Sequence, residues 1–229
     1  MGTENDPYLI ANLENLYWMT ENSGEWDKYY IQTSNIDASS TSAWDDGQGF
    51  TPLGNNSIKF TGSYDGSGYT INGLNINRPS TAFIGLFGYT LGSTIKDLGV
   101  INVNIAGGSR TGGLVGYNKF SSVSNCYSTG SVTGTDFVGG LSGMVDDSST
   151  VNNCYSTSDV NGSGNVVGGL VGKNISSSVS NCYSTGSVTG TDFVGGIIGS
   201  SSWGYAVSGL FWNINDFSTD NGIGTGITT

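Results

Sequence analysis

The chain has 229 residues and a net charge of −11, from 18 acidic and 7 basic side chains, and it contains no histidine. This acidic balance disfavours nucleic-acid binding, which needs a basic surface, and attachment to anionic membranes. With 12 Tyr, 9 Phe and 5 Trp the chain is too aromatic for a disordered protein, whereas 38 Gly and only 3 Pro suit short strands joined by many turns.

Residues 1–28 are predicted to form an N-terminal cap. They open on polar residues without the pattern of a signal peptide, so a mature secreted domain, a fragment of a longer chain and a cytoplasmic protein all stay compatible with this start. Residues 12–22 predict a short helix with Asn12 as its N-cap. We expect its apolar side chains to cover the open end of the following array and block edge-to-edge pairing.

An internal repeat dominates residues 29–215. The twenty residues at 121–140 recur unchanged at 177–196, with a weaker copy halfway between them, and the period of about 28 residues extends to both sides. Such a unit is too short for a propeller blade, and its Gly, Ser, Thr and Val content does not suit helices. The pattern therefore predicts an all-β fold, a β-solenoid of about six or seven coils with three short strands and three turns each. The repeat units are placed at residues 82–110, 111–137, 138–166, 167–193 and 194–215.

Alternation along the strands predicts which side chains point inward. In the segment that begins at Cys126, every second residue counted from Cys126 aligns with the apolar column of Leu98 and Val100, and these side chains are expected to point inward. A leucine column is also predicted to be buried: Leu86, Leu114, Leu141, Leu170 and Ile197. The Gly pair before it is expected to let backbones turn or approach closely. The opposite parity predicts an outward ladder and the candidate binding face: Tyr127, Thr129, Tyr155, Thr157, Tyr183 and Thr185.

The three cysteines, Cys126, Cys154 and Cys182, occupy the same repeat position. Their spacing of 28 gives no zinc-binding pair. A disulfide between stacked neighbours is allowed by distance, but buried free thiols that act as small apolar side chains are favoured.

The pattern breaks near residue 210. Phe211 and Trp212 are expected to close the last coil, and residues 216–229, rich in Gly and Thr, predict a loop or linker. No apolar run approaches the roughly 20 residues of a membrane span, so membrane insertion is not expected.

The repeat resembles a known family. Gly112-Gly-Leu-Val-Gly together with Val123-Ser-Asn-Cys-Tyr-Ser-Thr-Gly-Ser-Val resembles the GLUG motif of bacterial and archaeal secreted proteins. The flanks are similar too, from Asp6-Pro-Tyr-Leu-Ile to Phe211-Trp-Asn. The resemblance implies a right-handed parallel β-helix, displayed outside the cell within a longer polypeptide. Such repeats occur in adhesin-like surface proteins and in accessory regions of immunoglobulin A1 proteases, and no catalytic residues accompany the motif.

The chain has no histidine, which excludes a Ser-His-Asp triad. The acidic side chains are therefore the candidates for catalysis and for metal binding. The candidate acids are Asp45, Asp46, Asp65, the pair Asp146-Asp147 and the column Asp136, Asn165 and Asp192. The pair Asp146-Asp147 and the column are interpreted as turns, and structural roles are favoured over catalytic ones. Calcium stays open at Asp45-Asp46-Gly47 or Asp65–Gly68, although neither has EF-hand spacing. Arg110 is expected to be a solvated turn residue. No catalytic residue, cofactor-binding residue or metal ligand is predicted.

These observations predict a non-enzymatic, secreted or cell-surface module that serves as a stalk or as an adhesion surface. The expected partners are a host, cell-surface or matrix glycan or protein, with self-association along the solenoid left open. The alternatives are carbohydrate binding, polysaccharide cleavage of the lyase or glycosidase type, and ice binding through the Tyr/Thr ladder. For that ladder, simple stabilisation of the sheet is the main competing interpretation.

Overall fold

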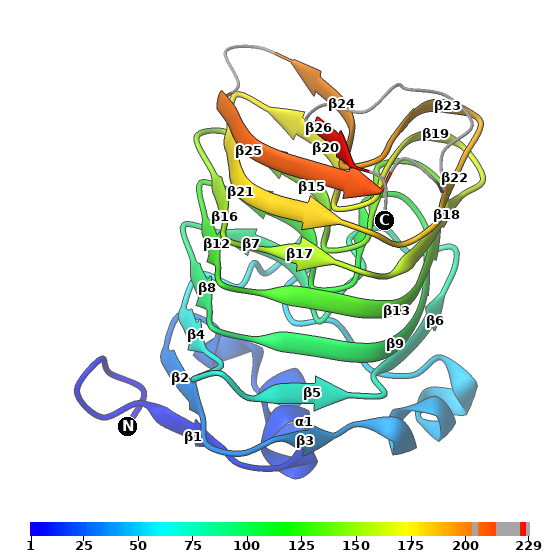
Figure 1. Cartoon of the computed structure of the whole chain (residues 1–229). Coiled ribbons are helices and arrows are strands. Elements are labelled where there is room, and N and C mark those ends of the chain that lie inside the picture. Colours follow the sequence, from blue (N-terminus) through cyan, green and yellow to red (C-terminus); the bar gives the residue numbers. More distant parts are fainter. Residues whose placement is uncertain (203–205, 214–224, 228–229) are drawn as a thin grey trace.

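Parallel strands stack coil upon coil along the whole molecule (Figure 1). The computed structural model describes residues 1–202, 206–213 and 225–227. Equivalent residues of successive repeats pair directly. Val123, for example, lies between Ile95 and Val151, and the same register continues along the array. The predicted all-β parallel solenoid is confirmed.

The largest sheet supplies two sides of each coil. The first side is built from β1 (Tyr8–Ile10), β2 (Tyr29–Gln32), β4 (Ser63–Asp65), β8 (Thr94–Lys96), β12 (Ser122–Ser124), β16 (Thr150–Asn152), β21 (Ser178–Ser184) and β25 (Ala206–Asn213). The second side is built from β3 (Ile36–Asp37), β5 (Thr70–Asn72), β6 (Asn75–Arg78), β9 (Gly99–Gly107), β13 (Tyr127–Gly134), β17 (Tyr155–Ser156), β18 (Asp159–Gly162), β22 (Val188–Thr189) and β26 (Thr225–Ile227), with β21 and β25 running on into it.

Two smaller sheets complete the coil. A five-stranded sheet forms the third side from β7 (Phe87–Leu91), β11 (Val115–Lys119), β15 (Ser142–Asp146), β20 (Val171–Ile175) and β24 (Ile198–Ser202). A four-stranded sheet of short strands precedes it, made by β10 (Thr111–Gly112), β14 (Val138–Gly139), β19 (Asn165–Gly168) and β23 (Asp192–Gly195).

The solenoid has about five turns, fewer than the six or seven predicted. The reason is local to the third side, where the five-stranded sheet starts only at β7. Before β7, residues 44–60 fill this side as irregular chain that touches the sheet through the isolated bridges Leu53–Phe87 and Phe60–Thr90. The first repeats therefore contribute strands to the large sheet without closing a complete coil.

A short helix covers the N-terminal end of the stack, as predicted. Helix α1 spans Leu13–Glu21, and the Asn12 side chain accepts a hydrogen bond from the Asn15 backbone N–H at 3.0 Å. Leu16 and Met19 of this helix are buried in the core, and the indole of Trp26 donates to the Met19 carbonyl at 2.7 Å. Three 3₁₀ turns follow at η1 (Ser23–Glu25), η2 (Ser39–Ala43) and η3 (Asp45–Gly47).

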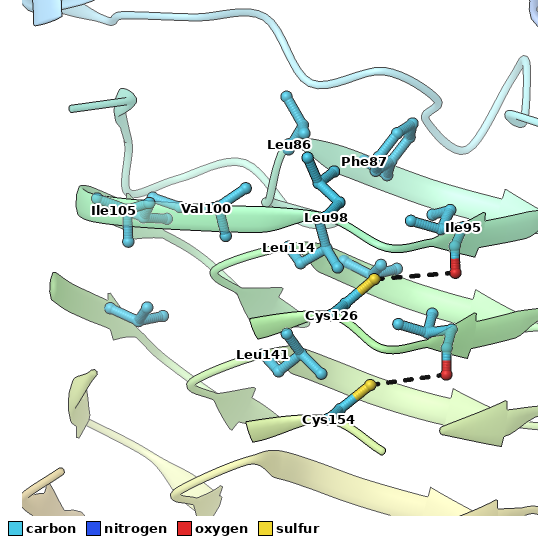
Figure 2. Close-up of a cluster of buried hydrophobic side chains, with 14 of the residues drawn as sticks. Leu86, Phe87, Ile95, Leu98, Val100, Ile105, Leu114, Cys126, Leu141 and Cys154 are labelled. Atoms are coloured by element: carbon cyan, nitrogen blue, oxygen red, sulfur yellow. Dashed lines mark hydrogen bonds between the residues drawn. The ribbon is translucent and has the colours of Figure 1, made fainter. Parts of the chain in front are cut away.

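The core consists of columns that run along the stack, with Cys126 and Cys154 beside Leu114 and Leu141 (Figure 2). Every member of the predicted leucine column is fully buried. The inward parity of the tyrosine strand is confirmed, because Cys126, Ser128 and Val132 are buried while Tyr127 and Ser131 are not. Glycine is required beside it, since a Cβ at Gly113 would overlap the Ser128 hydroxyl and lie 2.5 Å from the Gly140 carbonyl oxygen.

Each coil turns at three corners, and each corner holds a residue with positive φ. The corner between the first two sides has φ values of 53–61° at Asp97, Asn125, Asn153, Asn181 and Gly209. The corner after the five-stranded sheet has Gly92, Phe120, Ser148 and Ser176. The corner at the start of the four-stranded sheet has Phe83, Arg110, Phe137, Val166 and Phe193.

At the C-terminal end Trp212 is buried, whereas Phe211 is 45% exposed, so the indole is the side chain that enters the core. Of the predicted linker 216–229, Thr225–Ile227 forms β26, which pairs with β25, and the rest lies outside the described residues.

Candidate functional site

The three predicted tyrosines form a continuous ladder on the second side. The rings of Tyr127 and Tyr155 stack at 4.7 Å and 5°, and those of Tyr155 and Tyr183 at 4.8 Å and 4°. At the lower end the Tyr127 ring lies against Gly99, where any Cβ would overlap it. The ring spacing equals the distance between neighbouring strands, so the ladder follows from the parallel register.

Stacking decides what this ladder presents to solvent. In face-to-face stacks each inner ring face is covered by its neighbour, so the ring edges and hydroxyls point outward. Tyr127 and Tyr155 are half-buried, and Tyr183 is 40% exposed. Burial raises the pKa of Tyr155 and of Tyr183 above the ordinary tyrosine value. Sugar binding by aromatic residues uses open ring faces, which the interior of this ladder lacks.

The three threonines of the predicted face do not form an even row. Thr157 is exposed, whereas Thr129 and Thr185 are half-buried. The Thr129 hydroxyl accepts a hydrogen bond from the Asn102 backbone N–H at 2.9 Å, where the pairing of β9 with β13 shifts by one residue. One of the three hydroxyls is therefore already engaged with the neighbouring coil.

An asparagine column beside the ladder was not singled out from the sequence. Asn125 donates through Nδ2 to Asp97 at 2.8 Å, and Asn153 donates in turn to Asn125 at 3.3 Å. Asn and Asp tolerate the left-handed conformation that this corner needs. The available signal was the Asn before each cysteine, which the repeat places at the same turn every time.

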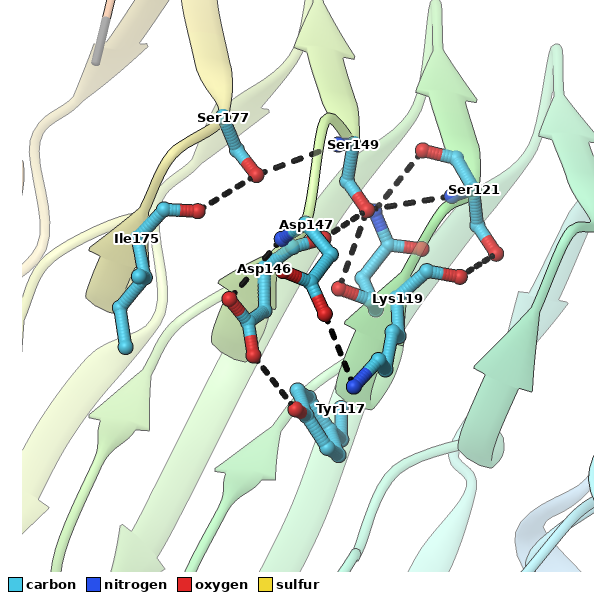
Figure 3. A network of polar contacts seen from close by, with 9 residues as sticks. Tyr117, Lys119, Ser121, Asp146, Asp147, Ser149, Ile175 and Ser177 are labelled. Atoms are coloured by element: carbon cyan, nitrogen blue, oxygen red, sulfur yellow. Dashed lines mark hydrogen bonds and ion pairs between the residues drawn. The ribbon is translucent and has the colours of Figure 1, made fainter. Parts of the chain in front are cut away.

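Buried hydroxyls also connect the coils, at the corner after the five-stranded sheet (Figure 3). The backbone N–H of Ser121 donates to the Ser149 hydroxyl at 3.1 Å, and that of Ser149 donates to the Ser177 hydroxyl at 3.1 Å. Each of these hydroxyls donates to a carbonyl of the preceding strand end, as Ser149 does to Asp146. The Ser-Ser turns thus satisfy buried backbone donors as well as reversing the chain.

The acids considered for catalysis are engaged in local contacts. Asp146 accepts a hydrogen bond from the Tyr117 hydroxyl at 2.6 Å, and Asp147 pairs with Lys119 at 2.8 Å (Figure 3). Burial and the Asp146 contact raise the pKa of Tyr117. Asp136 accepts a hydrogen bond from the Asn165 backbone N–H of the next coil at 2.8 Å, so its carboxylate links two coils.

The two loops considered for calcium carry ion pairs. Asp45 lies 2.7 Å from Arg78, and Asp65 lies 2.8 Å from Lys96. Burial alone would raise the pKa of Asp65, but hydrogen bonds from Lys96 and the Ser67 backbone outweigh it and lower that pKa. Across the residues that the structure describes, no three Asp, Glu or Cys side chains gather as a metal-binding group would require.

A pocket of about 610 Å³ lies at the N-terminal end, between α1 and the 3₁₀ turns. It is lined by Tyr17, Thr20, Glu21, Trp44, Asp45, Gly49 and Thr51. The rings of Tyr17 and Trp44 meet edge to face at 5.2 Å. The pocket holds two carboxylates, of which Asp45 is paired with Arg78, and sequence reasoning did not bring these residues together.

The cysteines are buried and free, as favoured from the sequence. Each thiol points toward backbone carbonyls, and Cys126 Sγ lies 3.1 Å from the Ser124 oxygen. Its longer contact with the Ile95 oxygen, at 3.9 Å, is drawn in Figure 2. The hydrogen bond with Cys126 raises the pKa of Cys154, and the hydrogen bond with Cys154 together with burial raises that of Cys182. Such thiols are poor nucleophiles.

Arg110 does not occupy the solvated position that was expected. Its guanidinium stands over three rings, with Cζ 5.3 Å from the centroid of Phe83, 5.6 Å from Tyr117 and 5.4 Å from Phe137. The guanidinium is drawn to the ring faces that the neighbouring coils place beside it, where cation–aromatic attraction replaces contact with water.

Known proteins match both the repeat and the fold. The model of the GLUG motif matches residues 107–133 and 163–189. Halomucin of Haloquadratum walsbyi is 37% identical over 154 residues, which cover 65% of this chain and 2% of halomucin. A candidate Gly-rich membrane protein of Evansella cellulosilytica is 39% identical over 89 residues, which cover 38% of this chain and 10% of that protein.

A solved structure shows the same architecture. It is that of a candidate immunoglobulin A1 protease from Bacteroides ovatus, with a TM-score of 0.66 and 20% identity over 92% of this chain and 76% of that one. At this identity the match concerns the fold alone. No helix among the described residues is long and apolar enough to cross a membrane. The chain therefore carries GLUG repeats and folds as a parallel β-solenoid.

Proposed function

We propose that this chain is a non-enzymatic, structural module of a longer extracellular polypeptide, which acts as a rigid spacer that holds other segments away from the cell. The observation that carries the proposal is the unbroken tyrosine ladder, whose rings stack at 4.7 and 4.8 Å across three coils. Such a stack stabilises the contact between neighbouring coils and leaves little ring surface for a ligand.

Contacts between coils elsewhere support the same role. The asparagine column and the buried serine hydroxyls each link one coil to the next, on separate corners of the solenoid. A repeat protein is as stiff as the interfaces between its neighbouring units, and here two of the three corners add these polar contacts to the backbone ladder. These contacts favour a segment that resists bending.

The setting in a longer polypeptide is supported by relatives. The chain spans about 2% and 10% of the two curated relatives described above, one of which is named for the membrane. A net charge of −11 suits exposure to solvent. Both facts favour a position outside the cell on a large protein.

Protease shaving of intact producing cells tests the location. We expect brief trypsin treatment to release peptides from this chain without lysis, with a cytosolic enzyme measured in parallel as the lysis control. Peptides found only after lysis would contradict the extracellular part of the proposal.

Polysaccharide cleavage is the competing function, and the pocket with Glu21 and Asp45 is where it would occur. Incubation of the purified chain with a panel of neutral and acidic polysaccharides should release no new reducing ends and no unsaturated products. Turnover that is lost in Glu21→Gln and kept in Glu14→Gln, a substitution on the same helix outside the pocket, would overturn the spacer proposal.

A further inference from the structure

A line of alternating rings and cations crosses the outer face of the five-stranded sheet. We name it the cation–aromatic row, and it consists of Lys59, Tyr89, Tyr117, Arg110, Phe137 and Lys173. Tyr89 and Tyr117 are paired neighbours on β7 and β11, and Lys173 extends their column on β20. Arg110 and Phe137 come from the adjacent corner.

Consecutive members of the row lie within contact distance. Lys59 Nζ is 5.4 Å from the Tyr89 centroid, and the Tyr89 and Tyr117 rings are 4.6 Å apart. Arg110 then bridges Tyr117 to Phe137, over which Lys173 Nζ stands at 5.9 Å. The row is therefore one continuous chain of contacts across several coils, in which Tyr89 is buried and the other members are half-buried.

The row also collects the unneutralised positive charge of the described chain. Of the seven bases, Lys28, Arg78, Lys96 and Lys119 form ion pairs with acids. Within the described residues, the three bases without an ion pair are Lys59, Arg110 and Lys173, all members of the row. On a protein of net charge −11, this sheet face is thus distinguished by unpaired cations.

Arg110 is the centre of the row and is held in place. It has φ of 60°, a conformation that is unfavourable for a side chain of this size, and rings flank its guanidinium. Its Nε is buried without a hydrogen-bond partner among the described residues, and Nη1 has only a 3.4 Å contact with Ser109. A fixed guanidinium with unused donors is suited to a carboxylate.

We propose that the cation–aromatic row binds an acidic polysaccharide that contains uronate residues. The cations are separated by rings, which matches a polymer whose carboxylates are spaced along a chain of sugar rings. The half-buried rings of Tyr117 and Phe137 pack against Arg110, and Phe137 also packs against Lys173, so the rings hold the cations at this spacing. Nucleic acid is a weaker match, because its dense phosphates need a longer basic track and would be repelled by the rest of this acidic chain. The row lies on a different sheet from the tyrosine ladder.

Isothermal titration at low salt with hyaluronan, alginate and chondroitin tests the proposal, with dextran and single-stranded oligo(dT) as comparison polymers. We expect at least one acidic polysaccharide to bind and the binding to weaken as salt is raised. Arg110→Gln should lower the affinity about tenfold, and Lys59→Gln and Lys173→Gln about threefold each.

Two variants serve as matched controls. Lys28→Gln removes the same charge from a lysine that lies outside the row and pairs with Asp27, and Tyr155→Ala removes a ring from the ladder, so both should leave the affinity unchanged. Circular dichroism checks the fold of every variant, and if Arg110→Gln does not fold, the double variant Lys59→Gln/Lys173→Gln decides.

The proposal is overturned if none of the three acidic polysaccharides binds, or if dextran or oligo(dT) binds as tightly. An equal loss of affinity in Lys28→Gln would overturn it as well, because binding would then depend on overall charge.

Discussion

The corners of this solenoid show how position changes the role of identical residues. Phe137 and Phe193 belong to the two identical twenty-residue copies and both have positive φ. Phe137 is half-buried under Arg110 and Lys173, whereas Phe193 is 67% exposed in the last complete coil. Burial at a corner is therefore set by side chains of the neighbouring coils, which the local sequence does not encode.

At the same scale, Gly113→Ala is expected to destabilise the fold by about 3 kcal/mol or more. The new methyl group would meet the Ser128 hydroxyl and the Gly140 backbone, neither of which moves without distorting a neighbouring coil. Gly24→Ala is the control, since nothing lies within 4 Å of a Cβ there. Urea unfolding of both variants measures the difference, and equal stabilities would contradict the close packing.

The cysteine column makes a second prediction at this scale. The raised pKa values of Cys154 and Cys182 and the burial of all three thiols mean that iodoacetamide at neutral pH should label none of them in the native protein. All three should be labelled in denaturant without reductant, as counted by mass spectrometry. Label that appears only after reduction would show a disulfide instead.

At the scale of the strand, the tyrosine ladder should be worth a measurable part of the stability. Tyr155→Ala removes two ring stacks and is expected to cost about 1–3 kcal/mol, whereas Tyr155→Phe keeps both rings and should cost less than about 0.5 kcal/mol. Chemical denaturation measures both free energies of unfolding. Equal stability of the two variants would contradict a contribution of ring stacking to the free energy of unfolding.

The direction in which side chains point from the strands was predictable because it alternates with a period of two residues. The buried Cys126 and the outward Tyr127 were assigned by alternation alone, and the leucine column followed from its unbroken apolar character. The number of coils was not predictable in the same way. Residues 44–60 have no repeat pattern, and only tertiary contacts such as Leu53–Phe87 show that they replace a side of the coil.

The cation–aromatic row illustrates what a repeat pattern hides. Arg110, Phe137 and Phe83 occupy equivalent corners but differ in chemistry, so no column of like residues marks them. Lys59 comes from the irregular segment before the first complete coil. The row forms because the stacking of coils brings these unlike residues together. The tyrosine ladder, in contrast, could be predicted because tyrosine recurs at the same position of each repeat.

For the whole molecule, buried phenols and thiols predict loss of stability in alkali. Burial raises the pKa of Tyr64, and the contacts above raise that of Cys182, from ordinary values of 10.0 and 9.0. Because the folded state holds these protons more tightly, their contribution is complete below the ordinary pKa and is lost as pH rises through the raised one. The free energy of unfolding should fall from about pH 9 upward, by roughly 1.4 kcal/mol per pH unit for each such group.

Denaturation curves between about pH 8 and pH 11 check this slope. Tyr64→Phe should flatten it above about pH 10, although it also removes the hydrogen bond from Tyr64 to Gln32. A stability that stays level across this range would contradict the burial of these groups.

The two identical copies carry a consequence for how such a chain changes over generations. They start 56 residues apart and lie two coils apart in the stack, with Ser122, Thr150 and Ser178 in register. Unequal crossing-over between their coding sequences would insert or remove whole pairs of coils and leave every column in phase. Each event would lengthen or shorten the solenoid by roughly 10 Å, so its reach is a trait that recombination can adjust without a single new side chain.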